Sequence, residues 1–239
     1  MPELELVTFN THYGRRPPSA RCVPYDLGSV LDELASADVL SVQEVWRPDG
    51  GPCLVERFAA RQGYEMHEIV FGRAGVDRRW PGFRHGGGGT VGIAVLSRLP
   101  MRSCNGPVVG PTWRDPIAAR RLLHVELDVG GVTTTLIGVH LTSRLPYGPP
   151  QQLRRLARQT ADIGGPAVLA GDCNFWGPPA QLLLPGWARA VRGRSWPAQQ
   201  PHSQIDHVFV RGPIEVVDGA VLPDVGSDHR PVRARLRVG

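Results

Sequence analysis

Acidic, amide and imidazole side chains recur at the ends of strand-like segments of this 239-residue chain. Glu44 comes two residues after the apolar run 39–42, and Asp172 comes two residues after the apolar run 167–170. Carboxylates are seldom placed beside buried strands unless they are paired or bound to a metal, because their desolvation is unfavourable. The full set comprises Asn10, Glu44, His140, Asp172, Asn174, Asp206, Asp228 and His229. We therefore expect several strand ends to converge on one polar site.

Each of these residues also has a purely structural explanation. Asn10 could open a turn, and Asp172 could cap the segment that follows it. A histidine on an apolar strand, such as His140, is more often a hydrogen-bonded core residue than a catalytic one. His207 is expected to be structural, because it faces the opposite side of its strand from Asp206. It is the combination in one chain that favours a shared site.

Strand-like and helical segments alternate along the chain and predict a mixed α/β protein. Gly130-Gly131 joins two of the strands and is a hairpin signal. Roughly ten strands, with no repeat or linker, predict one domain over residues 1–239 in which two packed sheets carry helices outside. Strands are expected at 4–10, 39–42, 64–70, 91–96, 121–129, 132–141, 167–170, 205–210, 214–221 and 231–238, and helices at 25–37, near 54–58 and at 151–163.

The segment from Gly72 to Thr90 is rich in glycine and arginine and is expected to be a long loop. Its Trp80 and neighbouring arginines could engage bases and phosphates, and a solvated loop in an arginine-rich chain is the alternative. Four consecutive glycines, 86–89, are not followed by Gly-Lys-Ser/Thr and a helix. This excludes a phosphate-binding P-loop.

Composition limits the classes of protein that fit. All 27 basic residues are arginine, and against 22 acidic residues they give a net charge of +5, which permits an anionic partner without identifying one. The four cysteines have no zinc-finger spacing, so no structural zinc site is expected. No apolar run approaches the ~18 residues that span a bilayer, and the first residues do not resemble a signal peptide. We expect a cytoplasmic monomer with no membrane span.

The polar residues stand in ordered motifs that together resemble the endonuclease/exonuclease/phosphatase superfamily. The resemblance extends from Leu4 to about Leu236. It implies a four-layered α/β sandwich, the fold of DNase I-like and exonuclease III-like nucleases, and a metal-dependent hydrolase of phosphate esters. The motifs are Thr8-Phe9-Asn10, Gln43-Glu44, Gly138-Val139-His140-Leu141, Gly171-Asp172-Cys173-Asn174, Ile205-Asp206-His207 and Ser227-Asp228-His229-Arg230-Pro231.

The resemblance also implies a metal site. Mg²⁺ usually takes one or two protein carboxylates, substrate phosphate and water. Glu44 would be the principal ligand of Mg²⁺, for which Mn²⁺ can substitute. Asn10 would assist at the metal or through its water, and Asp228 would be a ligand or an outer partner of a second cation position.

Catalytic roles follow from the same resemblance. Asp172 would deprotonate the attacking water, and Asn174 would hold that water or a phosphate oxygen. His229 would contact the scissile phosphate while Asp206 fixes its tautomer. His140 would contact the phosphate or protonate the leaving oxygen.

The resemblance defines the phosphoester bond that is hydrolysed more closely than it defines the substrate, because one fold hosts many substrates. Arg120 and Arg121 are expected to bind substrate together with Asn174 and His140, and the pair 15–16 could also point into the cleft. We expect an anionic phosphoester, above all nucleic acid. The alternatives are a small phosphorylated metabolite or lipid headgroup and, outside enzymes, a catalytically silent binding protein on the same fold. The absence of lysine argues against dedicated repair of abasic sites.

Overall fold

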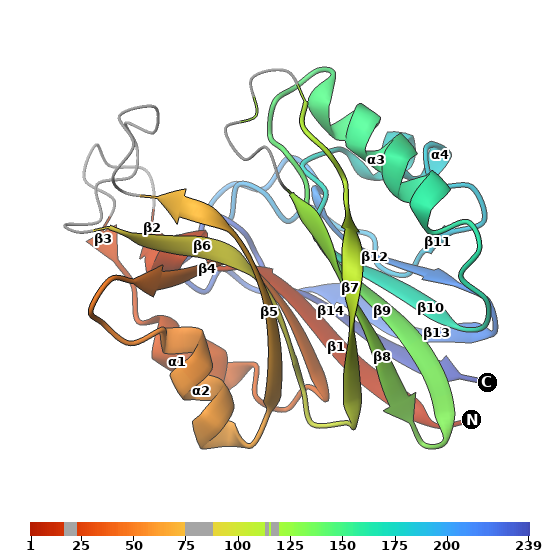
Figure 1. Cartoon of the computed structure of the whole chain (residues 1–239), viewed down its shortest axis with the longest axis horizontal. Helices are drawn as coiled ribbons and strands as arrows, with labels where there is room; N and C mark the ends of the chain where they lie inside the picture. The colour runs from red at the N-terminus through yellow and green to blue at the C-terminus, as the bar shows by residue number, and fades with distance from the viewer. Residues whose placement is uncertain (17–22, 75–87, 113–114, 116–119) are drawn as a thin grey trace.

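The computed structural model describes residues 1–16, 23–74, 88–112, 115 and 120–239. Two six-stranded sheets pack face to face, and helices cover the outer faces of both (Figure 1). The layers therefore run helix, sheet, sheet, helix. This is the four-layered α/β sandwich that the sequence motifs predict, and the prediction is confirmed.

The first sheet is built around a parallel pair of strands, β1 (Glu3–Asn10) and β4 (Val39–Pro48). Its strand order is β13-β14-β1-β4-β6-β5. Helices α1 (Leu27–Glu33) and α2 (Leu54–Gln62) pack on its outer face. The remaining strands are β5 (Glu65–Ala74), β6 (Gly89–Ser97), β13 (Ile214–Val221) and β14 (Val232–Val238).

The second sheet repeats this plan around a parallel pair, β9 (Val132–His140) and β10 (Ala167–Asp172). Its strand order is β11-β12-β10-β9-β8-β7, and α3 (Gly148–Gln159) and α4 (Gly177–Leu182) pack outside it. In the register of the parallel pair, His140 lies beside Asp172. The remaining strands are β7 (Met101–Val108), β8 (Arg121–Val129), β11 (Ala188–Arg189) and β12 (Asp206–Arg211).

The main core lies between the sheets and follows from alternation along the strands. In β1, Leu4 and Leu6 face the second sheet, whereas Val7 and Phe9 face the helices. In β14, buried Val, Ala and Leu alternate with three arginines, and Arg237 pairs with Glu3 and Glu215 at the surface. The arginines of this strand therefore form the solvated face that its sequence predicts.

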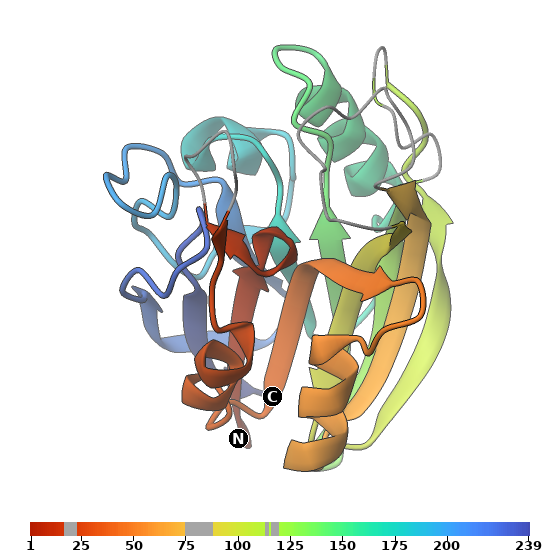
Figure 2. The same cartoon turned by 90° about the vertical axis from the view of Figure 1, so that its left-hand side faces the viewer.

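The ends of the parallel strands gather at one end of the molecule. The turn η1 (His12–Gly14) follows β1 there, away from the two chain termini (Figure 2). A two-stranded ribbon, β2 (Arg15–Arg16) with β3 (Val23–Pro24), continues from this turn. No helix among the described residues is long and apolar enough to cross a bilayer.

All ten predicted strands are present, and the main differences are missed elements. The strand β7, the helix α4 and the turn η1 lack a clear pattern because each is short, proline-containing or interrupted by glycine. Helix α3 begins at Gly148 and ends at Gln159. It therefore starts three residues before the predicted start and ends four residues before the predicted end. The expected glycine-rich loop is shorter than 72–90, because β5 continues to Ala74 and β6 begins at Gly89; residues 75–87, with Trp80, lie outside the described residues.

Candidate active site

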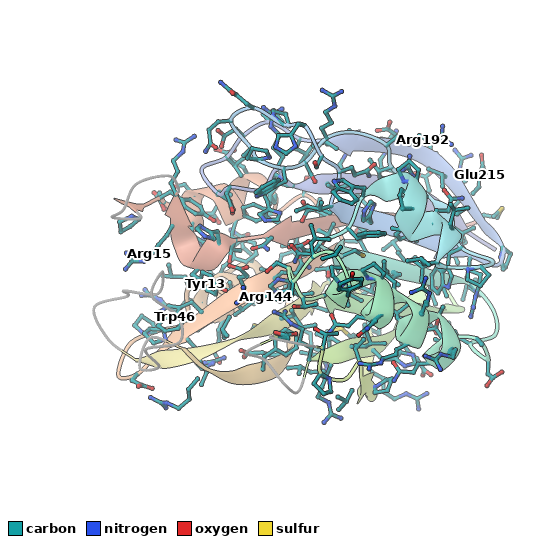
Figure 3. The ribbon with its side chains drawn as sticks, turned by 90° about the horizontal axis from the view of Figure 1, so that it is seen from above. Tyr13, Arg15, Trp46, Arg144, Arg192 and Glu215 are labelled. Atoms are coloured by element: carbon teal, nitrogen blue, oxygen red, sulfur yellow. The ribbon has the colours of Figure 1, made fainter. Side chains whose placement is uncertain are left out.

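A cleft of about 420 Å³ opens where the ends of the two parallel strand pairs meet. Seven of the predicted site residues line it: Glu44, Arg120, His140, Asp172, Asn174, Asp228 and His229. Figure 3, which looks onto the molecule from above, labels Tyr13 on the wall from the first sheet. It also labels Arg144, which lies between the lining residues Ser143 and Leu145 of the second sheet's side.

Asp172 is the most enclosed acid of the cleft and is surrounded by donors. Its Oδ1 accepts the backbone N–H of Asn174 at 2.7 Å, and its Oδ2 accepts the amide groups of Asn10 and Asn174, each at 3.1 Å. Burial, and next the charge of Asp206, raise the pKa of Asp172 to about 7, although His229 and these hydrogen bonds oppose the rise. Asp172 is therefore poised to exchange a proton near neutral pH.

The backbone before Asp172 explains its position. Gly171 has φ 149°, and a Cβ there would collide with the carbonyl oxygen of Val139 on the neighbouring strand. Only glycine allows β10 to approach β9 this closely at its last residues. The Gly-Asp-x-Asn motif thus places Asp172 next to His140.

Glu44 reaches the cleft because β4 bulges at this point. It has φ 57° and is the extra residue in the pairing of β4 with β6. Asn10 donates to Glu44 Oε1 at 3.4 Å, whereas Glu44 Oε2 is buried and makes no hydrogen bond. Burial raises the pKa of Glu44. A buried carboxylate oxygen with no partner fits a hard divalent cation, for which such oxygens are ligands.

His229 is held by Asp206 behind the cleft. Its Nδ1 lies 3.0 and 2.9 Å from the two oxygens of Asp206, and its Nε2 lies 3.9 Å from Asp172 and 3.8 Å from Asp228. Burial alone would lower the pKa of His229, but the charges of Asp206 and Asp228 outweigh it and hold the pKa well above its usual value. His229 is therefore a cation facing the cleft.

Asp172, Asp206 and His229 also have ligand atoms within 4.8 Å of one another, a spacing that could hold a metal ion. Both oxygens of Asp206, however, already face Nδ1 of His229. This cluster is therefore a histidine–aspartate pair beside Asp172, whereas Oε2 of Glu44 makes no hydrogen bond.

His140 lies between the two acids. Its Nε2 is 3.7 Å from Glu44 Oε1 and 3.7 Å from Asp172 Oδ2. Burial, and then the charges of Arg120 and His229, lower the pKa of His140 well below its usual value. A neutral imidazole can donate a hydrogen bond from Nε2 but is a poor source of a proton.

Arg120, just before β8, and Arg121, its first residue, make different contacts, because their side chains point in different directions. Arg120 is 4% exposed, lines the cleft, pairs with Asp115 at 2.9 Å and donates to the carbonyl of His140 at 3.0 Å. Arg121 instead donates to the carbonyl of Gly106 and does not line the cleft. The structure thus brings Arg120 to the site but not Arg121. Arg16 is likewise paired away from it, with Asp224 at 2.7 Å.

Sequence reasoning missed two residues of η1. Among the described residues, the non-glycine positions with positive φ are His12, Tyr13, Glu44 and Asn174, and all four line the cleft. Left-handed backbone is unfavourable for such residues and is concentrated at functional sites. Burial, and next the charge of Glu44, raise the pKa of Tyr13 well above its usual value, so the phenol keeps its proton and can donate to Glu44. The polar pair Thr11-His12 after the first strand was the available signal.

Apolar side chains also line the cleft, and sequence reasoning missed them. They come from loops at the end of the second sheet: Leu145, Trp176, Trp196 and Ile205. Trp176 is 47% exposed and Leu145 is 49% exposed. The lining of the cleft therefore combines polar and acidic side chains with apolar and aromatic ones.

A four-layered sandwich with acids, amides and histidines at the strand ends defines the DNase I-like class of folds. The chain belongs to the Endonuclease/Exonuclease/phosphatase family, whose model matches residues 7–229. Members of this family are hydrolases that act on phosphoester bonds.

Relatives of similar sequence include two UPF0294 proteins. The one from Vibrio cholerae is 27% identical over 163 residues, which cover 63% of this chain and 56% of the relative. The one from Klebsiella pneumoniae is 31% identical over 130 residues, which cover 52% of this chain and 45% of the relative. The chain therefore spans about half the length of these relatives.

Two solved structures illustrate the likeness in fold. An endonuclease/exonuclease/phosphatase from Beutenbergia cavernae is 25% identical with a TM-score of 0.77, over 100% of this chain and 72% of that chain. D. rerio TDP2 complexed with single strand DNA product is 18% identical with a TM-score of 0.63, over 99% of both chains.

Proposed function

We propose that this protein hydrolyses phosphodiester bonds with a bound divalent cation, Mg²⁺ first and Mn²⁺ as a substitute, and that its substrate is nucleic acid. The observation that carries the proposal is the convergence of two acids, half-buried Glu44 and buried Asp172, with the cationic His229 in one cleft. Phosphoryl transfer requires that a water be activated and that negative charge on the phosphate oxygens be neutralised. Two acids and a positively charged histidine in one cleft meet both requirements.

Glu44 would hold the cation through Oε2, which lacks any other partner. Asn10 is better suited to positioning than to binding the ion, because its Oδ1 already accepts the backbone N–H of His12 at 3.0 Å. Its amide N–H groups face Glu44 and Asp172 and keep the two carboxylates apart and oriented. Asp228 would be an outer partner of the cation. A bound Mg²⁺ would supply positive charge to the phosphate oxygens.

Asp172 would act as the general base. It would take a proton from the attacking water as the water oxygen forms a bond to phosphorus and the bond from phosphorus to the leaving oxygen breaks. A pKa of about 7 suits this task, since a base works best when its pKa lies near the working pH. Asn174, whose amide reaches Asp172, would hold the water in line.

The remaining residues would stabilise charge on the phosphate. His229, kept cationic and oriented by Asp206, would donate from Nε2 to a phosphate oxygen. Arg120 would add a second positive charge from the cleft wall. His140 would donate a hydrogen bond as a neutral imidazole, so the leaving oxygen would take its proton from solvent rather than from His140.

Two observations support nucleic acid as the substrate. The chain carries a net charge of +5, and the cleft is lined by Trp176 and Trp196, whose rings can stack on bases. The DNA product in the structure of TDP2, a protein of the same fold, agrees with this proposal. A second candidate is a small phosphorylated metabolite or lipid headgroup, because about 420 Å³ is also the size of a pocket for small ligands.

A panel of substrates tests the proposal with Mg²⁺, Mn²⁺ or EDTA. It contains supercoiled plasmid, single-stranded DNA, abasic duplex, RNA, an aryl phosphodiester and an aryl monophosphate. We expect metal-dependent cleavage of nucleic acid that falls steeply with salt, because phosphate contacts are screened. Cleavage of the monophosphate alone would overturn the phosphodiesterase proposal, and activity that persists in EDTA would overturn the role of the cation.

A further inference from the structure

Trp176 lines the cleft, yet the reaction proposed above gives its side chain no chemical step. The ring is 47% exposed, although tryptophan is on average highly buried in folded proteins. Leu145 lines the same cleft and is 49% exposed. Two large apolar side chains that stay half exposed in one cleft indicate a ligand that covers them.

The backbone around Trp176 holds its ring in place. Asn174 is left-handed, with φ 49°, and its N–H donates to Asp172 at 2.7 Å. The carbonyl of Phe175 accepts a hydrogen bond from Nε2 of buried His207 at 2.9 Å. The rings of Phe175 and Trp176 pack with their centroids 5.3 Å apart, and Trp176 is the N-cap of α4. A ligand therefore finds the indole already positioned and need not order it.

Leu145 also projects from an anchored loop. The side-chain amide of Asn174 donates to the carbonyl of Leu141 at 3.0 Å, so the loop after β9 is joined to the loop after β10. The N–H of Thr142 donates to the buried side chain of Gln152 at 2.8 Å. The two exposed apolar side chains thus come from loops that a hydrogen bond joins beside the proposed base.

The short spacing between Trp176 and the reacting groups defines what the ring can reach. Asn174 donates to the proposed base, Asp172, at 3.1 Å, and Trp176 follows Asn174 by two residues, which span at most about 7 Å of backbone. We propose that Trp176, together with Leu145, stacks on an unpaired base next to the scissile phosphate, and that the protein therefore acts on single-stranded rather than duplex nucleic acid. The inference rests on the proposed function in that the phosphodiester binds in this cleft.

The state of the bases explains the preference for a single strand. In a duplex each base is covered by its neighbours, so only an unpaired base offers its face to a protein ring. Arg144, next to Leu145, is exposed, and its side chain has no partner among the described residues, so it is available to a backbone phosphate (Figure 3). A lipid surface would also cover apolar side chains, but Trp176 and Leu145 line the cleft that holds Asp172. Their position favours a ligand that enters the cleft.

Binding of labelled oligonucleotides to the whole protein in EDTA tests this inference. Fluorescence anisotropy compares a short single strand, the same strand in a duplex, and a strand of equal length that lacks bases. We expect the single strand to bind about tenfold more tightly than the other two, because stacking on one aromatic ring contributes at least this factor. In Trp176→Ala we expect this advantage to be lost, with binding of the base-free strand unchanged, whereas Trp176→Phe should keep most of it.

The matched control is Leu182→Ala, because Leu182 is 85% exposed on the same helix α4 but does not line the cleft. Equal binding of the single strand and the base-free strand, or an advantage that survives in Trp176→Ala, would overturn the stacking site. Binding to phosphatidylcholine vesicles that depends on Trp176, in place of binding to the single strand, would also overturn it.

Cleavage assays with Mg²⁺ separate this inference from the proposed function. We expect the single strand to be cleaved at least about tenfold faster than the duplex, and Trp176→Ala to reduce this ratio. Equal cleavage of the single strand and the duplex would overturn the preference and leave the phosphodiesterase proposal standing. A binding advantage that depends on Trp176, without cleavage of any nucleic acid, would support the stacking site and count against the proposed hydrolysis.

Discussion

The hydroxyl of Ser41 donates to the carbonyl oxygen of Ala170 at 3.1 Å, across the interface between the two sheets. Both residues are buried, three residues before Glu44 on one strand and two residues before Asp172 on the other. Gln43 donates to the same hydroxyl and to the carbonyl of Ser41. This bond therefore joins the strand that carries Glu44 to the strand that carries Asp172 from within the core.

Loss of this bond should weaken both the fold and the site. We expect Ser41→Ala to lower the free energy of unfolding by about 1–3 kcal/mol, because the buried amide of Gln43 and the carbonyl of Ala170 lose a partner. Urea denaturation measures the change. Ser97→Ala, at the far end of β6, is the control for loss of a buried hydroxyl. A variant as stable and as active as the wild type would contradict the structural role of Ser41.

Replacement of Glu44 should remove metal-dependent turnover and leave the fold intact. Glu44→Ala removes the long hydrogen bond from Asn10 to Oε1, but it also removes a carboxylate whose desolvation is unfavourable in the metal-free protein. We therefore expect Glu44→Ala to unfold at a temperature no lower than the wild type in EDTA, while its activity falls by orders of magnitude. Near-normal activity at saturating Mg²⁺ would count against the assignment.

Neutralising Asp206 should act through His229. In Asp206→Asn the imidazole loses the charge that outweighs its burial, so a smaller fraction of His229 is cationic near neutral pH. We expect kcat/KM to fall by about a hundredfold or more, as for other charge-stabilising groups of active sites. Steady-state kinetics measure the loss in kcat/KM. The pH above which kcat/KM declines reports the loss of the cationic form of His229. Asp128→Asn, at an exposed hairpin, is the matched control, and an equal loss there would refute the assignment.

The rate should depend on pH through Asp172. Because burial raises the pKa of its carboxyl to about 7, the group is protonated below that pH and can accept a proton only above it. We expect kcat/KM to rise with pH up to about neutrality and then to level off. A bound cation near Asp172 would lower the pKa of its carboxyl. We therefore expect kcat/KM to rise at a lower pH when the metal is saturating. A rate that falls between pH 6 and 7 would contradict Asp172 as the base.

The stability of the protein should depend on pH through His207. Burial lowers the pKa of His207 to about 4, and its Nε2 is bonded to the carbonyl of Phe175 at 2.9 Å. Between pH 4 and the usual value near 6.5 the unfolded chain binds a proton here and the folded protein does not, so stability is lost as the pH falls through this window. The loss is at most about 3.5 kcal/mol, at about 1.4 kcal/mol for each pH unit.

Unfolding of His207→Gln at several pH values measures this contribution. We expect the variant to be less stable than the wild type above pH 6.5, since the packing and the bond to Phe175 are altered, but to lose less stability on acidification. His202→Gln, at an exposed position, should retain the full dependence on pH. An unchanged slope in His207→Gln would argue against a buried neutral imidazole.

The sequence by itself determined the secondary structure of most of the chain and the identity of most polar site residues. Alternation of two residues identified the strands, because a half-buried strand needs one apolar face. The Gly-Asp-x-Asn and Ser-Asp-His-x-Pro motifs carry polar side chains whose combination at buried strand ends favoured a shared site over separate structural roles. The pairing of Asp206 with His229, 23 residues apart, was implied by the family resemblance and not by these patterns.

Only the tertiary structure decided which side chains enter the cleft. Arg120 and Arg121 are the same residue type, so the sequence treats them alike. Only the folded structure shows that their side chains bind different partners. His12 and Tyr13 gain their place from a left-handed turn that no periodicity predicts. The apolar and aromatic residues that line the cleft come from three loops that are distant in sequence. Periodic patterns record which face of a strand is buried, whereas the position of a loop side chain depends on what the other sheet places opposite it.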